Sequence, residues 1–514
     1  MKKLTILYGL IFLPFLLLSQ EGELDLSFNG NGKYILDLHT DDEATSVLIQ
    51  PDEKILIGAT VTTSRPVSSV LVRLDRYGNA DLGFGNQGVA EVVWDDYEPD
   101  VQSIALDGNQ NILALARASY QSESGVLLTR FDPNGNLDQS FADSGMVFIG
   151  DWDGSSTYWT SVIAMPDGEI VVSGYTFFTG EGVNGVLLGF NHDGSPNFNF
   201  GDNGMVKFNL GGSTVQIHKL ILNQNNKILA IGSGYSQGDN NFLLAQFNQD
   251  GSFNSGFGGN GILTVPFGEN SRAYGADIQE DGKIILAGDI YMDSDYAFAL
   301  ARLLPDGTLD QSFGTNGKVI TPVLKGDAYA KSVSVLGDGK ILVAGDADGI
   351  WNRDFALVRY HSDGSLDPSF SLDGIATKNI GNRDDHAKAA AIQPNGRLVI
   401  VGGSFVNDFG NNVICAARFL GGAGITGIDE FEETVLHLHI YPNPASDRVR
   451  IEAAENVSRL DVRLIDQQGR VVRELSASGR EAEFDVNGLS PGLYLLKIVA
   501  DGKKVVYRKV MVGS

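Results

Sequence analysis

Short runs of residues with strand character fill most of the chain, in groups of four separated by turn residues. One such group consists of residues 318–322, 331–336, 340–345 and 355–360. Alternation with a period of two is typical of β-strands, and no segment keeps a helical period. Asp-Gly or Asn-Gly pairs, such as Asp281-Gly282 and Asn395-Gly396, separate the second and third runs. These dipeptides favour hairpin turns, so each group predicts a small antiparallel sheet.

The groups are copies of one unit. One motif recurs seven times: a Phe is followed four positions later by a Gly and is preceded three positions earlier by an acidic or amide residue. The Phe residues of this motif are Phe28, Phe84, Phe141, Phe200, Phe257, Phe313 and Phe370. Successive spacings are 56, 57, 59, 57, 56 and 57 residues. A four-stranded sheet of this size buries both faces only against copies of itself, and four strands per repeat is typical of propeller blades. The sequence predicts an all-β fold with a seven-bladed β-propeller at residues 21–420, in preference to an open solenoid with atypical end repeats.

The phasing of the runs also bears on how the ring closes. All four runs of the first unit follow Gly32, and those of the seventh end near Phe419. No strand exchange between the first and last blades is therefore predicted, and closure rests on packing between complete blades unless residues 21–32 reach across.

Most fourth runs end in an arginine. These residues are Arg73, Arg130, Arg302, Arg359 and Arg418, with Gly189 and Gln246 in the third and fourth units. Apart from Arg130, which follows Thr129, each Arg lies between two apolar residues, so its aliphatic part can cover a blade face while the guanidinium contacts a carboxylate. The pattern indicates a structural role.

The repeated motif itself has a known counterpart. Residues 306–317 read Asp-Gly-Thr-Leu-Asp-Gln-Ser-Phe-Gly-Thr-Asn-Gly, and 363–370 and 134–141 follow the same pattern. This motif resembles the bacterial delta-60 repeat family over about 400 residues. The resemblance implies a propeller-like domain with no assigned activity.

The first residues indicate export. Lys2 and Lys3 precede an apolar run from Leu4 to Leu18. A basic start before an apolar run too short to cross a bilayer is typical of a cleaved secretory signal, predicted at residues 1–20. No later run is long enough for a membrane span.

The composition changes after Leu420. A glycine-rich, then acidic segment predicts a linker at residues 421–434, and the alternating runs that follow predict a small immunoglobulin-like β-sandwich at residues 435–514. The motif residues are Tyr441, Pro442, Asn443, Pro444, Gly492 and Tyr494. This region resembles the type A C-terminal sorting domain of the type IX secretion system of Bacteroidetes. The resemblance implies that residues 435–514 engage the outer-membrane secretion machinery, and that the protein is secreted or on the cell surface of a Gram-negative bacterium.

The formal net charge is −26, and the repeat region holds this acidic excess. Nucleic-acid binding needs clustered Lys and Arg, so nucleic acid is not an expected partner. Cys415 is the only cysteine, which excludes an intramolecular disulfide.

The candidate binding residues come from the segments in which the copies disagree. The loops joining the first run to the second and the third to the fourth vary, and in a propeller both sets emerge on one face, where a rigid scaffold can present a site. Many of their residues are acidic, which predicts a strongly negative face. The candidates are Trp94, Asp95, Asp96, Asp151, Trp152, Asp153, Trp159, Asp289, Asp293, Asp295, Asp346, Asp348, Trp351, Asp384 and Asp385.

Three interpretations of these loops stay open. They are solvated loops without a ligand, a site for a cationic, glycan or protein partner that stacks on the Trp rings, or a calcium site built from carboxylate oxygens. No complete calcium loop with a closing Glu is present, and neither a metal site nor a cofactor is assigned. No catalytic residue is assigned either, because Ser236 in its G-x-S-x-G sequence follows a strand of a β-repeat and not a strand-to-helix turn.

The sequence therefore predicts an exported, non-catalytic binding or adhesion module delivered by its sorting domain. The alternative is a secreted polysaccharide-active hydrolase or lyase with carboxylates at the mouth of the channel. Glycoside hydrolysis needs two carboxylates about 5 to 9.5 Å apart, which a sequence cannot show.

Overall fold

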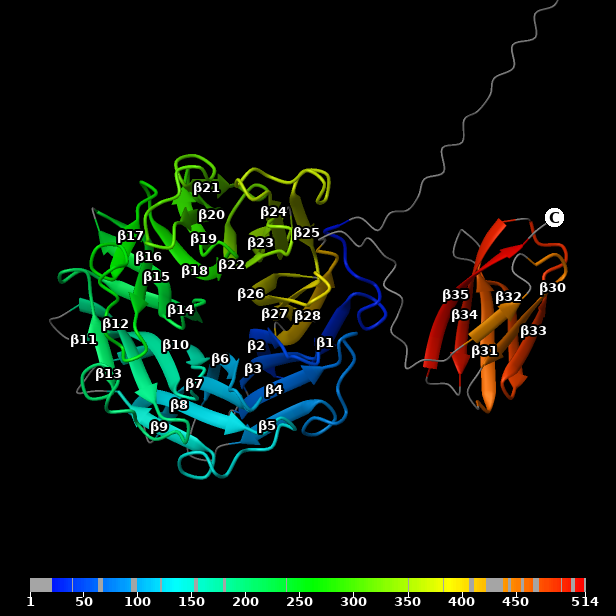
Figure 1. The fold of residues 1–514 in the computed structure, drawn as a ribbon, viewed down its shortest axis with the longest axis horizontal. Coiled ribbons are helices and arrows are strands. Elements are labelled where there is room, and N and C mark those ends of the chain that lie inside the picture. The colour runs from blue at the N-terminus through cyan, green and yellow to red at the C-terminus, as the bar shows by residue number, and fades with distance from the viewer. Residues whose placement is uncertain are drawn as a thin grey trace, which may run out of the picture. The chain divides into compact units, whose positions relative to one another are not determined.

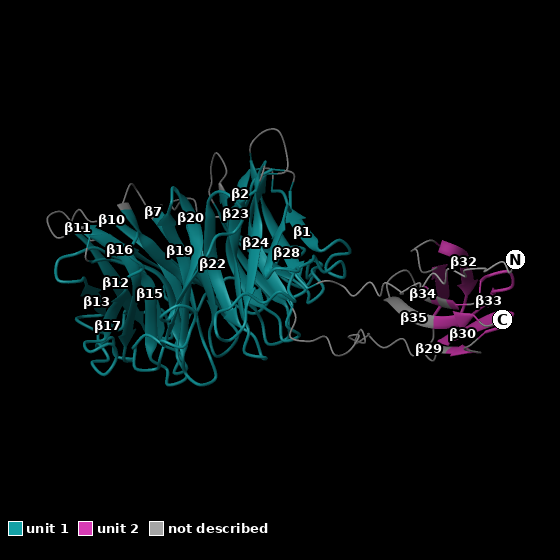
Figure 2. Cartoon of the chain, turned by 90° about the horizontal axis from the view of Figure 1, so that it is seen from above, with its two compact units in different colours: residues 1–423 teal, residues 424–514 magenta. Residues whose placement is uncertain are grey.

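A computed structural model gives the fold of two compact units, residues 1–423 and 424–514, which are described separately (Figure 2). The described residues are 21–38, 40–62, 68–93, 99–120, 123–151, 156–178, 182–236, 238–349, 351–381, 383–405, 411–421, 438–441, 445–453, 457–465, 471–490, 492–500 and 504–512. The predicted signal and almost all of the predicted linker lie outside them.

The first unit consists of seven four-stranded antiparallel sheets arranged around a centre (Figure 1). The first three sheets are β2 (Asp41–Ile49), β3 (Ile55–Thr62), β4 (Ser68–Leu74), β5 (Val89–Val93); β6 (Asp100–Leu106), β7 (Ile112–Tyr120), β8 (Glu123–Phe131), β9 (Met146–Gly150); and β10 (Ser156–Ala164), β11 (Ile170–Phe178), β12 (Gly182–Phe190), β13 (Met205–Phe208). The next three are β14 (Val215–Leu222), β15 (Ile228–Ser236), β16 (Asp239–Phe247), β17 (Ile262–Val265); β18 (Ser271–Ile278), β19 (Ile284–Met292), β20 (Asp295–Leu303), β21 (Lys318–Thr321); and β22 (Ala328–Val335), β23 (Ile341–Asp348), β24 (Arg353–Tyr360), β25 (Ile375–Lys378). The seventh is β26 (Asp385–Ile392), β27 (Leu398–Phe405), β28 (Asn412–Phe419) and β1 (Lys33–Leu36).

The innermost strands close a ring. β2, β6, β10, β14, β18, β22 and β26 contact one another in turn, and β26 contacts β2. The middle strands of each sheet are covered on both faces by neighbouring sheets, which is why β4 is buried along its whole length and reads as an apolar run. The all-β propeller prediction is confirmed.

The prediction about closure is wrong. Every sheet takes its outermost strand from the following repeat, and the seventh sheet takes β1 from the first repeat, pairing Lys33–Leu36 with β28 (Figure 1). The cause is the Phe/Gly motif, which turns the chain back along the strand before it. In the first sheet the Arg73 N–H donates to Gly88 O (2.8 Å) and the Asp81 N–H to Arg73 O (2.9 Å).

At the seam the same two bonds join residues at opposite ends of the unit. The Arg418 N–H donates to Gly32 O (3.0 Å), and the Asp25 N–H donates to Arg418 O (2.8 Å). Residues 21–32 also reach across, as the exception in that prediction allowed, because the Gly22 N–H donates to Leu420 O (2.8 Å). The ring is therefore closed by hydrogen-bonded pairing as well as by packing.

A buried set of three side chains, here named the repeat clamp, recurs at five of the seven junctions. In each, an Arg Nε donates to the motif Asp at 2.8 Å and the guanidinium lies over the motif Phe, with 4.3 to 4.9 Å between Cζ and the ring centroid. The clamps are Arg73/Asp81/Phe84, Arg130/Asp138/Phe141, Arg302/Asp310/Phe313, Arg359/Asp367/Phe370 and Arg418/Asp25/Phe28. The structural role predicted for these arginines agrees with these contacts.

The other two junctions replace the clamp in a consistent way. In the fourth unit Gln246 and Asn254 join by an amide hydrogen bond. In the third, the Phe200 ring fills the space beside Gly189, where an added Cβ would lie 2.5 Å from Phe200 Cβ. Charge is removed from both partners together, which avoids leaving a buried ion alone.

The second unit is a two-sheet sandwich around one core. One sheet has the order β29 (Leu438–Tyr441), β30 (Arg448–Ala453), β33 (Glu481–Asp485); the other β32 (Val471–Ser478), β31 (Arg459–Ile465), β34 (Gly492–Ala500), β35 (Lys504–Val512). Ile451 from the first sheet and Val462 and Leu496 from the second belong to the same buried cluster. An immunoglobulin-like topology stays a prediction.

Candidate ligand-binding site

Each innermost strand of the propeller contains one extra residue, a β-bulge, at an equivalent position. The bulged residues are Thr45, Gln102, Thr160, His218, Tyr274, Lys331 and Lys388. Two positions earlier lie Glu43, Asp100, Tyr158, Gln216, Arg272, Tyr329 and His386. A bulge bends a strand and redirects its side chains. We name these two positions per blade the inner lining.

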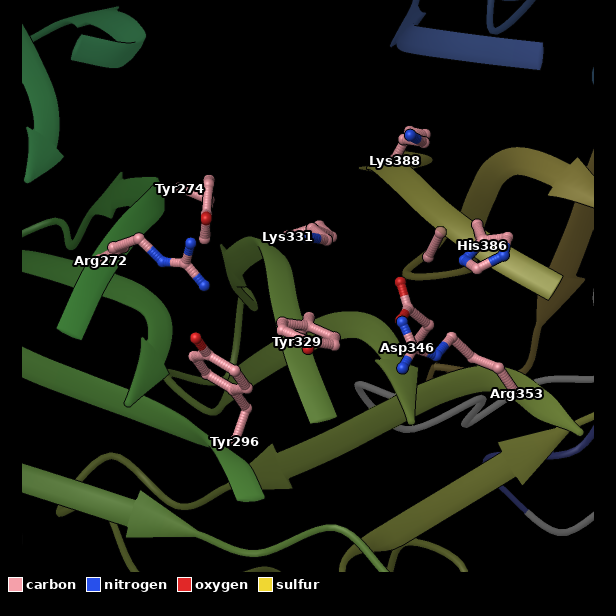
Figure 3. Close-up of a pocket in the computed structure, with 10 residues that line it drawn as sticks. Arg272, Tyr274, Tyr296, Tyr329, Lys331, Asp346, Arg353, His386 and Lys388 are labelled. Carbon is pink, nitrogen blue, oxygen red and sulfur yellow. The ribbon is translucent and has the colours of Figure 1, made fainter. Parts of the chain in front are cut away.

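The inner lining of three neighbouring blades forms a cavity of about 370 Å³. Its residues are Arg272 and Tyr274 on β18, Tyr329 and Lys331 on β22, and His386, Ala387 and Lys388 on β26, with Tyr296 on β20, Asp346 on β23 and Arg353 on β24. Figure 3 shows Lys331 in the middle, with Arg272 and Tyr274 on one side and Asp346, Arg353 and His386 on the other. The cavity, here named the basic pocket, thus gathers four cations and three tyrosines.

Carboxylates hold three of these cations. Arg272 donates to Asp289 at 3.1 and 3.3 Å, and its guanidinium lies 5.2 Å from the centroid of the Tyr296 ring. Arg353 donates to Asp348 (2.7 Å). These pairs fix the direction of both guanidinium groups, which keep further N–H donors for a ligand.

Lys388 is held from the neighbouring blade. Its Nζ lies 3.0 Å from a carboxylate oxygen of Glu43 on β2. This ion pair spans the seam between the seventh sheet and the first.

Lys331 is different, because within the described part of the chain no carboxylate lies within ion-pair distance of its Nζ. The Nζ instead lies 4.7 Å from the centroid of the Tyr274 ring and 5.1 Å from that of Tyr329. Burial lowers the pKa of this ammonium group. The charges of Asp346 and Asp289 act on this half-buried cation only from beyond ion-pair distance, so it has unused hydrogen-bond donors, and an anion placed beside it gains more than it would at an exposed lysine.

Asp346 is the one carboxylate among the residues that line the basic pocket. Burial raises its pKa to about 6, and its Oδ1 atom has no hydrogen-bond partner among the described residues, with Arg353 Nη1 3.6 Å away. Burial and positive neighbours lower the pKa of His386. Among the lining residues the cations outnumber the carboxylates, and because Asp289, Asp348 and Glu43 pair with three of them, Lys331 is the lining cation without an ion-pair partner among the described residues.

Two of the tyrosines, Tyr274 and Tyr329, stay protonated at any physiological pH. Burial and the hydrogen bond from its hydroxyl to Asp327 (3.0 Å) raise the pKa of Tyr329 to about 12, and burial also raises that of Tyr274. The Tyr274 hydroxyl can therefore donate a hydrogen bond to a ligand, whereas the Tyr329 hydroxyl already donates its proton to Asp327 and can only accept one.

The residues predicted from the variable loops are scattered. Trp94, Asp95, Asp96, Trp152 and Asp153 lie outside the described residues. Of the others, Asp346 lines the basic pocket, while Asp289 and Asp348 hold its two arginines. Trp159 is a core residue at 1% exposure, and Trp351 is 90% exposed.

The remaining acidic candidates bind the backbone of their own or a neighbouring loop, or lie at a hairpin turn. Asp384 accepts from the Arg353 N–H (2.9 Å), Asp151 from the Thr157 N–H (3.2 Å), and buried Asp385 from the Ile380 N–H (2.6 Å). Asp293, at φ 52°, and Asp295 lie at the turn between β19 and β20. Among the described residues, no group of three or more His, Cys, Asp or Glu is placed to hold a metal ion.

The basic pocket itself was not predicted. Lys331 and Lys388 read as ordinary polar positions of alternating strands, and the pocket combines three units of the sequence. An alignment of the seven copies at the bulge could have found it, because that position changes from Thr and Gln to Tyr and Lys around the ring.

In the second unit, Tyr441 is 43% exposed and its hydroxyl donates to Glu452 (3.2 Å). Gly492 begins β34, and the Tyr494 hydroxyl donates to Ser490 O (2.8 Å). Pro442, Asn443 and Pro444 lie outside the described residues.

The two units together define an exported β-propeller protein. Residues 439–513 match the secretion system C-terminal sorting domain. Residues 224–257, 279–313 and 336–370 match a β-propeller domain of unknown function. The C-terminal unit is thus a type IX sorting domain that engages the secretion machinery, and the protein is secreted or on the surface of a Gram-negative bacterium, as predicted. The described residues include no helix that is both long and apolar enough for a membrane span.

Several solved structures match the chain at low similarity. Polysaccharide lyase Uly1 is 9% identical with a TM-score of 0.42 over 74% of this chain and 90% of its own, and Drosophila Semaphorin 2a is 7% identical with a TM-score of 0.42 over 96% and 99%. The α-L-arabinanase of Penicillium chrysogenum, complexed with arabinobiose, is 12% identical with a TM-score of 0.35 over 62% and 93%. At these identities no function is transferred. No curated protein matches the sequence.

Proposed function

We propose that this exported propeller is a non-catalytic binding module that captures an anionic sugar, bearing a carboxylate or sulfate group, in the basic pocket. The observation that carries the proposal is Lys331, a half-buried ammonium group between the rings of Tyr274 and Tyr329 with no ion-pair partner among the described residues. Arg272 and Arg353 converge on the same cavity, and a planar guanidinium binds carboxylate or sulfate in two-point fashion.

The tyrosines favour a sugar over a simple inorganic anion. A sugar ring has an apolar face of C–H groups and an edge of hydroxyls, and a tyrosine offers a ring face and a hydroxyl. A cavity of about 370 Å³ is within the size range of small-molecule sites. Polysaccharides are also among the molecules to which a secreted or surface-displayed protein is exposed.

The experiment is a glycan array followed by calorimetry on the secreted protein. We expect uronate-bearing or sulfated glycans to bind and neutral ones not to bind. The K331M substitution should weaken binding at least about 10-fold, since a charge-assisted hydrogen bond contributes about 1.5 to 3 kcal/mol. K325M is the matched control, because Lys325 is an exposed lysine in the loop before β22 that does not line the pocket. The proposal would be refuted if the two variants bound with equal affinity, or if no anionic glycan on the array bound the protein.

A second candidate is the lyase in the predicted enzymatic alternative. The lining holds one carboxylate, Asp346, which does not favour a hydrolase with paired acids. A lyase needs a cation beside the uronate carboxylate, a base that takes the ring C–H proton and an acid that protonates the departing oxygen. His386 with its lowered pKa and the protonated tyrosines match those requirements in kind. Appearance of the unsaturated sugar product, seen by its ultraviolet absorbance, would distinguish this activity from simple binding.

A further inference from the structure

The basic pocket joins two runs of contacting aromatic rings, one on β10, β11, β14 and β18 and the other on β22, β20 and β19. Ring-to-ring contacts lead from Phe177 through Tyr158, Tyr175, His218 and Tyr274 to the pocket, and continue from Tyr329 through Tyr296 to Tyr291. The row spans four consecutive sheets, those that contain β10, β14, β18 and β22. We name it the aromatic row.

One end of the row lies on β10 and β11. The rings of Tyr158 and Tyr175 stack with centroids 5.3 Å apart, and Phe177 packs edge-on against Tyr158 at 5.8 Å. Tyr158 is 38% and Phe177 42% exposed, so two large rings face solvent beside one another. Arg117 Nη2 lies 2.5 Å from Asp100 Oδ2, and Arg117 Cζ lies 5.2 Å from the centroid of the Tyr158 ring.

The middle of the row leads inward to the basic pocket. His218 lies 6.3 Å from Tyr175 and stacks on Tyr274 at 4.6 Å. Burial lowers the pKa of His218 to about 4, so this imidazole is neutral at physiological pH and presents a ring face and not a charge. Tyr274 then contacts Lys331 at 4.7 Å.

The other end of the row forms a second cavity of about 370 Å³. Its lining residues are Asn240, Asn270, Arg272, Tyr291 and Tyr296. Arg272 and Tyr296 line both cavities, so the two are adjoining parts of one groove. The Tyr291 and Tyr296 rings lie 5.1 Å apart, and Tyr291 is 41% exposed. The asparagine amides add neutral donors and acceptors.

The rest of the inner lining has the opposite character. In the first two sheets the equivalent positions are Glu43, Thr45, Asp100 and Gln102. These four positions have no aromatic residue, and their two carboxylates pair with Lys388 and Arg117, so the ring faces of the inner lining lie on the side of the aromatic row.

We propose that the aromatic row and the two adjoining cavities form an extended groove for a linear acidic polysaccharide, with a charged sugar in the basic pocket and neighbouring sugars on the ring faces of Tyr291 and of Tyr158 with Phe177. This inference rests on the proposed function and extends it, because a free monosaccharide would use only the pocket. The rings at both ends of the row are exposed and those in the middle are half-buried. This arrangement fits a polysaccharide that has one sugar bound in the basic pocket and further sugars extending beyond it.

The test is calorimetry of the full secreted chain with galacturonic acid and its linear trimer and hexamer. We expect affinity to rise with length. Y291A and F177A should each weaken hexamer binding about 3- to 10-fold while leaving monomer binding unchanged, because each removes one ring face outside the basic pocket. F198A is the matched control, since Phe198 is a 70% exposed ring outside the row. Unchanged melting temperatures would show that all three variants fold.

The outcomes separate the two proposals. Equal affinity for monomer and hexamer, or hexamer binding that Y291A and F177A leave intact, overturns the extended groove and leaves the pocket as the site. Absence of binding to every acidic sugar overturns both. A single-stranded oligothymidylate that binds more tightly than the hexamer would assign the groove to nucleic acid instead, since stacking on aromatic residues beside cations is also how single strands are bound.

Discussion

The repeat clamp and the inner lining both occupy equivalent positions in seven copies, but their copies vary in opposite ways. Five clamps share one Arg, one Asp and one Phe with the same 2.8 Å bond, and the amide pair Gln246–Asn254 replaces both charges at once. At the bulge position, by contrast, the residue changes from Thr45 to His218 to Lys331 around the ring.

This difference separates stability from recognition. The clamps are buried or half-buried between sheets, where an altered partner leaves an uncompensated charge, so their variation is restricted to paired changes. The inner lining is only partly buried, and its residues rest on strands whose hydrogen bonds do not depend on the side chain at the bulge. Function can therefore change there without loss of the fold.

The largest effect on stability is expected from removal of residues 21–36, because this deletion removes β1 and Asp25, the partner of Arg418. The seventh sheet loses its outer strand, and Phe28 no longer covers the cluster that contains Val70 and Val401. We expect the free energy of unfolding to fall by more than about 5 kcal/mol, which exceeds the cost of breaking one buried ion pair. Unfolding is followed by tryptophan fluorescence, which reports on the propeller alone because all four Trp lie within it. A midpoint unchanged from that of the intact chain would mean that packing alone closes the ring.

The next largest effect is expected for Arg302→Ala. Asp310, which is 7% exposed, would keep its hydrogen bond with Ser312 and Lys283 Nζ at 3.6 Å but lose the ion pair with Arg302, and its pKa, which Ser312 and Arg302 hold at about 2, would rise. Removal of one partner of a buried ion pair lowers the free energy of unfolding by about 3 to 5 kcal/mol. Urea unfolding of the variant measures this cost.

The control for that substitution is copied from the fourth unit. The double variant R302Q/D310N reproduces the Gln246–Asn254 pair, and we expect it to recover most of the lost stability. A double variant as unstable as Arg302→Ala would show that the charge itself, and not its pairing, is required.

The repeat and its fold could be predicted from the sequence, because Phe28 and its six equivalents recur at nearly constant spacing and each is buried. The strand exchange could not, since a periodic pattern is the same whether β5 pairs with the strand before it or after it. The basic pocket was missed because a bulge does not disturb alternation enough to be seen. The acidic loops stay a prediction as a binding face, and one of the candidates, Asp384, accepts a backbone N–H bond from an adjacent loop, as do the loop residues Asp41 and Asp327.

A smaller effect, and one that depends on pH, is expected for Asp346→Asn. The folded pKa of about 6 lies above the ordinary value of 3.8, so the wild-type protein loses stability as pH rises through this window. The variant should therefore be about 1 to 3 kcal/mol more stable than the wild type at pH 7 and no more stable at pH 3. Unfolding midpoints at the two pH values measure this.

The same substitution tests the electrostatics of the basic pocket. Removal of its one lining carboxylate should strengthen binding of an acidic sugar at pH 7, and wild-type affinity should rise as pH falls below about 6, where Asp346 takes up a proton. Affinity that is weaker in the variant would mean that Asp346 binds the ligand directly, as a hydrogen-bond acceptor for a sugar hydroxyl.

The smallest effect is expected for Trp351→Ala, and it compares the variable loops with the inner lining most directly. Trp351 is 90% exposed in the loop between β23 and β24, two residues before Arg353, so its loss should change stability by less than about 0.5 kcal/mol. If the inner lining alone binds the sugar, affinity measured by calorimetry should stay within about 2-fold of the wild type. If affinity falls as far as in the K331M variant, the exposed ring is part of the site, and the binding surface extends from the inner lining onto the loops that the sequence singled out.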